Sequence, residues 1–167
     1  MTNAINPIGV IGAGTMGAGI SQAAASAGWS VRLYDINQEL VEQTQESVSK
    51  RFERLVEKGR ITLEESQENI RRITTTTSLN DLKDCDLIIE AIVEDFDIKT
   101  SVLKDVGNIA KDAIIATNTS SLSVSELGEA CTHADRLIGM HFFNPAPIMP
   151  LVEIIRGNQS SENAVNR

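Results

Sequence analysis

The residue types of an acid–base pair stand near the C-terminal end of the sequence. His141 ends an apolar run that predicts a strand, and Glu153 comes twelve residues later, between Val152 and Ile154 in a second apolar run. A carboxylate in such a strand needs a partner if it is buried, and His141 is a candidate. A neutral histidine held by a carboxylate can accept a proton and have the resulting charge stabilised. Two plainer interpretations stay open: a structural histidine, and an outward-facing glutamate on an edge strand.

Two other predicted strands are also followed by polar side chains, and the carboxyl ends of strands are where an open α/β sheet binds ligands. These side chains are Glu94 and Lys99 after residues 87–90, and Asn118, Ser120 and Ser121 after residues 113–117. A serine at such a point can contact a substrate oxygen, or it can merely cap a turn. The spacing alone does not decide between these roles.

A glycine-rich turn near the N-terminus has the pattern G-x-G-x-x-G between a predicted strand and a predicted helix. Its glycines allow a tight turn, a close approach of the backbone to a pyrophosphate, and close packing of the helix on the sheet. The free N–H groups of the helix N-terminus favour phosphates. The predicted cofactor contacts of this turn are Gly12, Gly14, Thr15, Met16 and Gly17. The alternative is a helix start whose glycines serve packing alone.

Asp35 ends the second predicted strand, 21 residues after Gly14. A carboxylate at this point accepts hydrogen bonds from the ribose hydroxyls and repels the 2′-phosphate of NADP. We therefore expect NAD as the cofactor. Under the plainer interpretation, Asp35 is an ordinary loop acid.

The elements that must position these residues alternate between strand and helix. The expected strands are Ile8–Ile11, Ser30–Tyr34, Ile73–Thr76, Leu87–Glu90, Ala113–Thr117, Arg136–His141 and Leu151–Ile155, with a loop at Phe142–Pro150. The expected helices are Thr15–Ala27, Gln38–Lys58, a piece capped by Thr62, Ile98–Ala110, Ser123–Ala130 and a first turn at Ser160–Arg167. This pattern predicts an α/β, Rossmann-type doubly wound fold: a mostly parallel sheet with a helical insertion after the second strand.

Composition narrows the possible partners. The chain has 167 residues and a net charge of −8, which argues against broad binding to nucleic acid or to a membrane surface. One helical stretch departs from this balance, because residues 48–60 hold five basic and two acidic side chains. Arg51, Arg54 and Lys58 could hold phosphates there, and pairing such as Glu46 with Lys50 on a solvated face is the alternative. No metal site is predicted, and two distant cysteines indicate reduced thiols in a cytoplasmic protein or in one of an organelle matrix, of which we expect the cytoplasmic location.

Four blocks of sequence together resemble the L-3-hydroxyacyl-CoA dehydrogenase family, most closely its bacterial 3-hydroxybutyryl-CoA type. The blocks are G-V-I-G-A-G-T-M-G-x-G-I, E-A-I-V-E, N-T-S-S-L and G-M-H-F-F-N-P-A-P-x-M-x-L-V-E-I-I, and they extend from Ile8 to about Gly157. The H-F-F-N-P block with its following glutamate is the most specific of them. The resemblance implies reversible oxidation of a 3-hydroxyacyl-CoA to the 3-ketoacyl-CoA with NAD.

The resemblance also implies roles for individual residues. His141 matches the catalytic histidine, Glu153 its carboxylate partner, and Ser120 the serine that contacts the C3 oxygen of the substrate. Cofactor contacts on the nicotinamide side are implied for Glu94, Lys99 and Asn118, and a ribose contact for Asp35. Lys58 matches a family contact to CoA, and we expect Arg51 and Arg54 beside it to bind the same substrate.

The resemblance further implies how the chain relates to a larger protein. Residues 1–158 would form an NAD-binding domain, and residues 159–167 would begin the connection to an all-helical domain that this chain lacks. In the family that domain dimerises and completes the acyl-CoA cleft, so we expect weak or no activity from the chain alone. The alternatives are a non-catalytic NAD-binding fragment, a related hydroxy acid dehydrogenase that uses a lysine, and an interaction domain.

Overall fold

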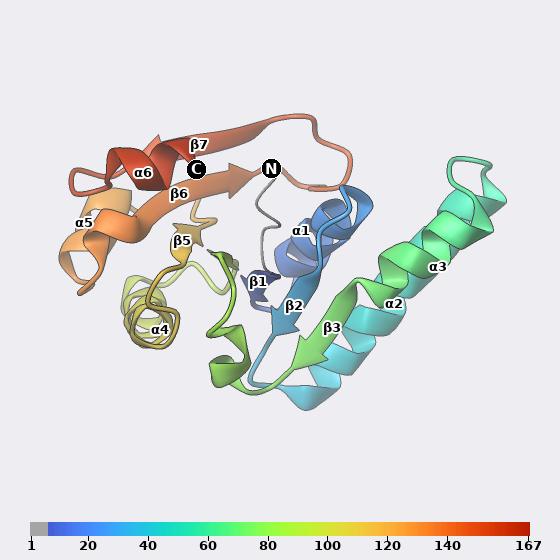
Figure 1. Cartoon of the computed structure of the whole chain (residues 1–167), viewed down its shortest axis with the longest axis horizontal. Helices are drawn as coiled ribbons and strands as arrows, with labels where there is room; N and C mark the ends of the chain where they lie inside the picture. Colours follow the sequence, from blue (N-terminus) through green and yellow to red (C-terminus); the bar gives the residue numbers. More distant parts are fainter. Residues whose placement is uncertain (1–6) are drawn as a thin grey trace.

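The computed structural model of the chain describes residues 7–167, so residues 1–6 of the predicted first domain lie outside the described part. A seven-stranded sheet runs through the molecule in the order β3-β2-β1-β4-β5-β6-β7 (Figure 1). Its strands are β1 (Ile8–Ile11), β2 (Val31–Tyr34), β3 (Ile73–Thr76), β4 (Leu87–Glu90), β5 (Ile114–Thr117), β6 (Leu137–Phe142) and β7 (Val152–Arg156). Every neighbouring pair is parallel except β6 and β7, which form an antiparallel pair at one edge.

Helices cover both faces of this sheet, as the predicted doubly wound fold requires. They are α1 (Thr15–Ser26), α2 (Gln38–Glu57), α3 (Leu63–Arg71), α4 (Phe96–Ile109), α5 (Val124–Glu129) and α6 (Glu162–Asn166), with 3-10 turns η1 (Leu79–Leu82) and η2 (Ala134–Arg136). One buried cluster joins the sheet to α1, α2 and α6, and a second joins it to α4, α5 and η1. In β4, Ile89 belongs to the first cluster and Ile88 to the second, because successive strand residues face opposite sides.

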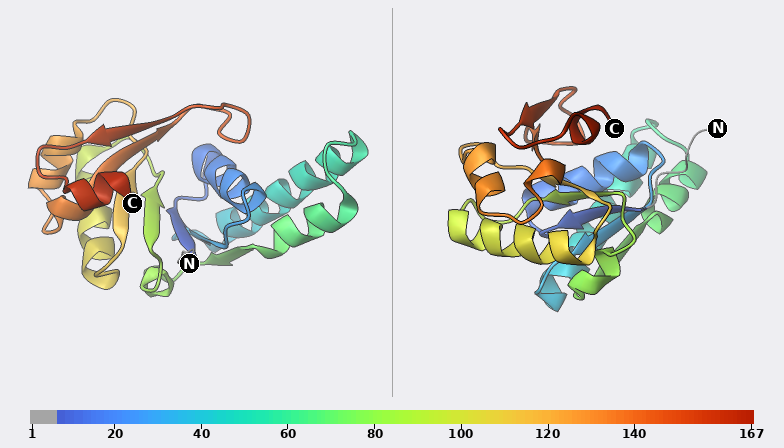
Figure 2. Two further views of the ribbon diagram at one scale, coloured as in Figure 1. Left: turned by 45° about the horizontal axis from the view of Figure 1, so that its top comes forward. Right: turned by 60° about the vertical axis from the view of Figure 1, so that its left-hand side comes forward.

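The helical insertion after β2 is a hairpin of α2 and α3 that extends beyond β3 (Figure 1). Its second helix begins with the predicted capping box: the Thr62 hydroxyl accepts the Glu65 N–H, and the Glu65 carboxylate accepts the Thr62 N–H. At the other end of the chain, the loop between β6 and β7 reaches over α1 (Figure 2). A Cβ added at Gly19 in α1 would lie 3.2 Å from the Ala146 Cβ of this loop.

Most predicted elements match the structure within two residues, and the differences have local causes. Helix α4 begins at Phe96 rather than Ile98, because the Asp95 side chain caps it by accepting the Ile98 N–H at 2.9 Å. Phe142 belongs to β6 rather than to the following loop, because it pairs with Val152. The sequence analysis did not predict η1 and η2, which are short turns without a clear periodic pattern.

The turn after β1 depends on glycine at two points. Gly12 has φ +101°, and a Cβ there would lie 2.7 Å from the Ala91 carbonyl oxygen. A Cβ at Gly17 would lie only 1.7 Å from the Gly12 carbonyl oxygen, so the first turn of α1 lies directly against the end of β1. Gly14 differs, because a Cβ there would meet no heavy atom within 4 Å. Gly12 and Gly17 therefore serve the fold itself, whereas Gly14 leaves open space.

Replacing Gly17 by alanine should destabilise the chain by about 3 kcal/mol or more, because the new Cβ would overlap a backbone oxygen that no rotamer change can move. Thermal unfolding followed by circular dichroism measures this effect. Gly14→Ala is the matched control, with an expected change within about 0.5 kcal/mol. Equal unfolding temperatures for the two variants would contradict the close packing described here.

Candidate active site

Strands β1 to β5 are all parallel and end in a single row of residues. Ile11 pairs with Tyr34 and Glu90, Tyr34 also pairs with Thr76, and Glu90 also pairs with Thr117. The segments that follow these five residues therefore begin side by side at one end of the sheet. These segments contain the glycine-rich turn, Asp35, and the polar residues predicted after the later strands. Strand β6 pairs with Thr117 through Gly139 and continues beyond this row to Phe142.

A cavity of about 320 Å³ opens at this end of the sheet. Residues from four separate stretches line it: Met16, Ala91, Ile92, Glu94, Asn118, Ser120, His141, Phe142, Phe143 and Asn144. A neighbouring cavity of about 360 Å³ shares Ser120 and His141 with the first and adds Glu153. The structure thus brings together Met16, Glu94, Asn118, Ser120 and His141, as the sequence analysis expects of side chains at strand ends.

His141 and Glu153 form a hydrogen-bonded pair. They are directly paired residues of the antiparallel strands β6 and β7, and Nδ1 of His141 lies 2.8 Å from Oε2 of Glu153. The Phe143 ring packs against the imidazole with a centroid distance of 4.6 Å. Because the carboxylate engages Nδ1, Nε2 is the ring nitrogen that can exchange a proton with a molecule in the cavity.

The environment of Glu153 differs from that of a buried strand carboxylate. The side chain is 49% exposed and the His141 side chain 20% exposed, because β7 is an edge strand. Glu153 therefore faces outward from an edge strand, as the plainer of the two interpretations predicted. Its pairing with His141 nevertheless matches the predicted acid–base arrangement.

Glu94 holds the backbone that carries Ser120. Its Oε1 accepts hydrogen bonds from the Thr119 hydroxyl at 2.5 Å, from the N–H groups of Ser120 and Ser121 at 2.9 and 3.0 Å, and from the Ser121 hydroxyl at 3.0 Å. Burial opposes ionisation of this carboxyl, but the hydrogen bonds and the charge of Lys99 outweigh it and lower the pKa of Glu94 to about 2. The carboxylate is therefore ionised at neutral pH.

Lys99 lies behind Glu94 and does not line the cavity. Its side chain is 1% exposed, and Nζ lies 2.6 Å from Oε1 of Glu90 and 3.3 Å from Oε2 of Glu94. The resemblance predicts that Lys99 contacts the nicotinamide side of the cofactor. In this structure Lys99 contacts Glu94 instead, and of the two only Glu94 lines the cavity. Glu90, which the sequence analysis did not assign to the site, is fully buried and also accepts the Thr117 hydroxyl at 2.7 Å.

Two other residues shape this end of the sheet. The Asn118 side-chain oxygen accepts the Phe142 N–H at 2.9 Å and so ties the end of β5 to the end of β6. Asn144, also not assigned from the sequence, lines both the cavity at His141 and a second cavity next to it. Two features of the sequence could have pointed to Glu90 and Asn144. Glu90 is a glutamate at the end of an apolar strand, and Asn144 is the asparagine of the H-F-F-N-P block.

The glycine-rich turn fits a dinucleotide. Helix α1 has no side-chain N-cap and no acid in its first turn, whereas α2 to α6 each have a side-chain oxygen as N-cap. The open space at Gly14 lets a phosphate approach these N–H groups. Asp35 lies next to the turn, where Oδ2 accepts the Ala13 N–H at 2.9 Å and Oδ1 accepts the Asn37 N–H at 3.0 Å. The carboxylate is thus fixed where a ribose would lie beside the turn.

Arg51 and Arg54 of α2, and Lys58 at its C-terminal end, line a cavity of about 460 Å³ together with α1 and the 144–148 loop. Lys50 does not; instead its Nζ lies 2.6 Å from Glu46 Oε1, so the alternative of helical pairing is correct for this one residue. The remaining three cations are placed to hold an anionic group.

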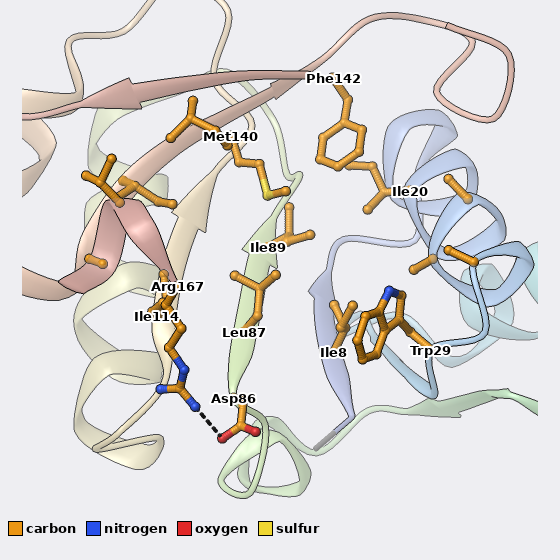
Figure 3. A pocket seen from close by; sticks show the side chains of 17 residues that line it. Ile8, Ile20, Trp29, Asp86, Leu87, Ile89, Ile114, Met140, Phe142 and Arg167 are labelled. Carbon is orange, nitrogen blue, oxygen red and sulfur yellow. Dashed lines mark ion pairs between the residues drawn. The ribbon is translucent and has the colours of Figure 1, made fainter. Parts of the chain in front are cut away.

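An apolar cavity of about 400 Å³ lies on one face of the sheet, between α1 and α6 (Figure 3). Ile8, Leu87, Ile89 and Ile114 form its floor, and Arg167 reaches across one end to Asp86 at 3.3 Å. The charged residues of its lining are Asp86 and Arg167, which pair with each other, and the remaining lining is mostly aliphatic. The chemistry of the chain is therefore concentrated at the polar end of the sheet.

Among residues 7–167, no cluster of three or more His, Cys, Asp or Glu side chains is placed to hold a metal ion. No helix among the same residues is both long and apolar enough to cross a membrane. Cys85 and Cys131 are free thiols, and burial raises the pKa of Cys85 to about 11, which makes it a poor nucleophile.

Comparison with known proteins agrees with this geometry. Residues 7–167 match the family model described as 3-hydroxyacyl-CoA dehydrogenase, NAD binding domain. A probable 3-hydroxybutyryl-CoA dehydrogenase of Deinococcus radiodurans is 45% identical over 92% of this chain and 55% of its own length. The fatty acid oxidation complex subunit alpha of Psychrobacter cryohalolentis is 42% identical over 97% of this chain and 23% of its own length.

A solved structure gives the same result for the fold. The crystal structure of (S)-3-hydroxybutyryl-CoA dehydrogenase from Ralstonia eutropha superposes with a TM-score of 0.93 at 43% identity, over 97% of this chain and 58% of that one. The chain thus spans little more than half the length of the dehydrogenases named here. From the family match and the site geometry together, the chain belongs to the NAD-binding domain family of 3-hydroxyacyl-CoA dehydrogenases.

Proposed function

We propose that this chain is the NAD-binding and catalytic part of an enzyme that oxidises (S)-3-hydroxyacyl-CoA to 3-ketoacyl-CoA, in fatty acid or related acyl-CoA metabolism. The observation that carries the proposal is the His141–Glu153 pair beside a cavity that Ser120 and the glycine-rich turn also line. Bound NAD would supply the hydride acceptor for C3 of the substrate. The relatives whose names describe 3-hydroxybutyryl-CoA dehydrogenases support the same reaction.

The residues of the chain supply alignment and proton transfer. Nε2 of His141 would take the proton of the C3 hydroxyl, and Glu153 on Nδ1 would hold the ring and stabilise the imidazolium that forms. The Ser120 hydroxyl would donate to the same substrate oxygen and orient it. Ser120 and His141 suit these roles because both line the two adjoining cavities.

The basic cavity would receive the CoA part of the substrate. Arg51, Arg54 and Lys58 would pair with its phosphates, and Asn144 lines both this cavity and the catalytic one. This arrangement supports an acyl-CoA rather than a small free hydroxy acid. A lysine-based dehydrogenase is disfavoured, because Lys99 is buried in ion pairs with Glu90 and Glu94.

The proposal extends to the protein that contains this chain. Residues 1–158 would act as the NAD-binding domain and residues 159–167 as the start of a connection to a helical domain, through which the protein would dimerise. A cytoplasmic location is part of the same proposal. The second candidate is a fragment that binds NAD without catalysis, which the partial coverage of the relatives favours for the chain alone.

His141→Gln in the full-length protein should lower kcat for acetoacetyl-CoA reduction by about 10²- to 10⁴-fold, the usual contribution of general acid–base catalysis. The affinity for NADH should not change, because the ring acts on the substrate oxygen. Stopped-flow kinetics and a fluorescence titration measure the two quantities. An unaltered kcat would show that His141 is not the catalytic residue.

Arg54→Ala or Lys58→Ala should raise the KM for acetoacetyl-CoA by about tenfold, because each removes a charge-assisted contact to phosphate. We expect kcat to stay nearly constant, since these residues lie away from the His141 cavity. Lys50→Ala is the matched control on the same helix, and steady-state kinetics compares all three. A KM increase in the control equal to that in the other two would contradict the basic site.

A further inference from the structure

We propose that Glu94, backed by the buried pair of Glu90 and Lys99, is a positioning residue that holds Ser120 in place for catalysis. The inference rests on the proposed function, because it takes Ser120 as the residue that orients the substrate oxygen. It differs from the role implied by resemblance, in which Glu94 and Lys99 contact the cofactor.

The contacts of Glu94 carry the first step. A single oxygen, Oε1, receives the N–H groups of both Ser120 and Ser121 and the hydroxyls of Thr119 and Ser121. Two successive backbone N–H groups that share one acceptor leave this segment little freedom to rotate. Since Ser120 itself is exposed, few other packing contacts restrain it. The direction of the Ser120 side chain therefore depends on where Glu94 lies.

The position of Glu94 is fixed in turn by Lys99. Nζ of Lys99, in α4, lies 3.3 Å from the second oxygen of Glu94, 2.6 Å from Glu90 Oε1 and 3.4 Å from the Ile92 carbonyl oxygen. Glu90 also accepts the Ile92 N–H at 2.8 Å, so the turn between β4 and α4 is held at several points.

The network of Glu94, Lys99 and Glu90 also contacts β5, the strand that precedes Ser120. Glu90 Oε2 accepts the hydroxyl of Thr117 in β5, and Ser120 comes three residues later in the same chain segment. The interactions thus form a ring from Thr117 through Glu90, Lys99 and Glu94 back to Ser120. Its two central members are almost completely buried, and a buried ion that loses its partner is strongly destabilised. The ring is therefore a rigid support rather than a set of independent surface contacts.

Amide hydrogen exchange in the cofactor-free chain separates this role from a cofactor contact. Glu94→Gln should speed exchange of the Ser120 and Ser121 amides by at least about tenfold, because a neutral amide is a weaker acceptor than a carboxylate. The Ile89 amide in β4 should be unchanged, which reports an intact fold. Glu129→Gln removes an exposed carboxylate on α5 and is the matched control. Unchanged exchange at Ser120 and Ser121 in the Glu94 variant overturns the proposal.

The buried part of the ring needs a separate test. Thr117→Val keeps the size of the side chain and both charges of the Glu90–Lys99 pair, but it removes the hydroxyl donor to Glu90. We expect a few-fold faster exchange at Ser120 and Ser121, smaller than in the Glu94 variant because the ion pair stays. No change at these two amides would remove Glu90 and Lys99 from the proposal.

Kinetics of the full-length protein distinguish this inference from the proposed function. Glu94→Gln should lower kcat for acetoacetyl-CoA reduction while the NADH dissociation constant stays within about twofold, a change of under 0.5 kcal/mol. A large loss of NADH affinity with unchanged kcat would instead assign Glu94 to cofactor binding. If the wild-type protein does not reduce acetoacetyl-CoA, the proposed function fails, whereas the exchange result stands on its own.

The ionisation of Glu94 gives a prediction in pH. Its pKa is lowered to about 2, so between pH 8 and about 4 the Ser120 and Ser121 amide chemical shifts should show no titration step that Glu94→Gln abolishes. A glutamate with the ordinary value of 4.5 would move these shifts within that range. Two-dimensional NMR spectra recorded across the range measure the effect. A midpoint near 4.5 at these amides that Glu94→Gln abolishes would contradict the hydrogen-bonding arrangement.

Discussion

The alignment of the parallel strands is the constraint on which the rest of the structure depends. Because Thr76, Tyr34, Ile11, Glu90 and Thr117 lie in one row, the chain leaves the sheet at the same level five times. Residues that are far apart in sequence, such as Met16 and His141, can then line one cavity. A shift in register of any one strand would displace its polar residues from this end of the sheet and turn its buried side chains to the wrong face. The geometry of the candidate site therefore follows from strand pairing before any side chain is considered.

The antiparallel edge strand β7 supplies Glu153, the carboxylate partner of His141. After β6 the chain turns back as β7, so that Glu153 comes to lie directly beside His141. This pair is local, because both residues belong to one hairpin. The support of Ser120 is different: it depends on contacts among β4, β5 and α4, through buried ions that only the folded chain brings together. One side of the cavity thus combines a hairpin with a network that extends into the core.

The sequence predicted those features whose causes are local or periodic. The glycine turn with Asp35 could be predicted because tight turns and close helix packing restrict residue choice, and His141 with Glu153 because the resemblance and the strand pattern agreed. The ring through Glu90 and Lys99 could not, since nothing in the spacing tells which buried charges face each other. The same limit applies to α2, where only the structure separates Lys50, paired with Glu46, from the three cations of the basic cavity. The start of α4 at Phe96 was missed because an apolar residue follows the Asp95 cap directly.

We expect the glycine-rich turn and Asp35 to form an NAD site in which the Asp35 carboxylate, held beside the turn by the Ala13 N–H, selects against a 2′-phosphate. Calorimetric titration of the purified chain with NADH and with NADPH tests this expectation most directly. We expect saturable binding of NADH at one site and at least about tenfold weaker binding of NADPH, a difference of about 1.4 kcal/mol. An absence of NADH binding, or equal affinities for the two cofactors, would contradict this expectation.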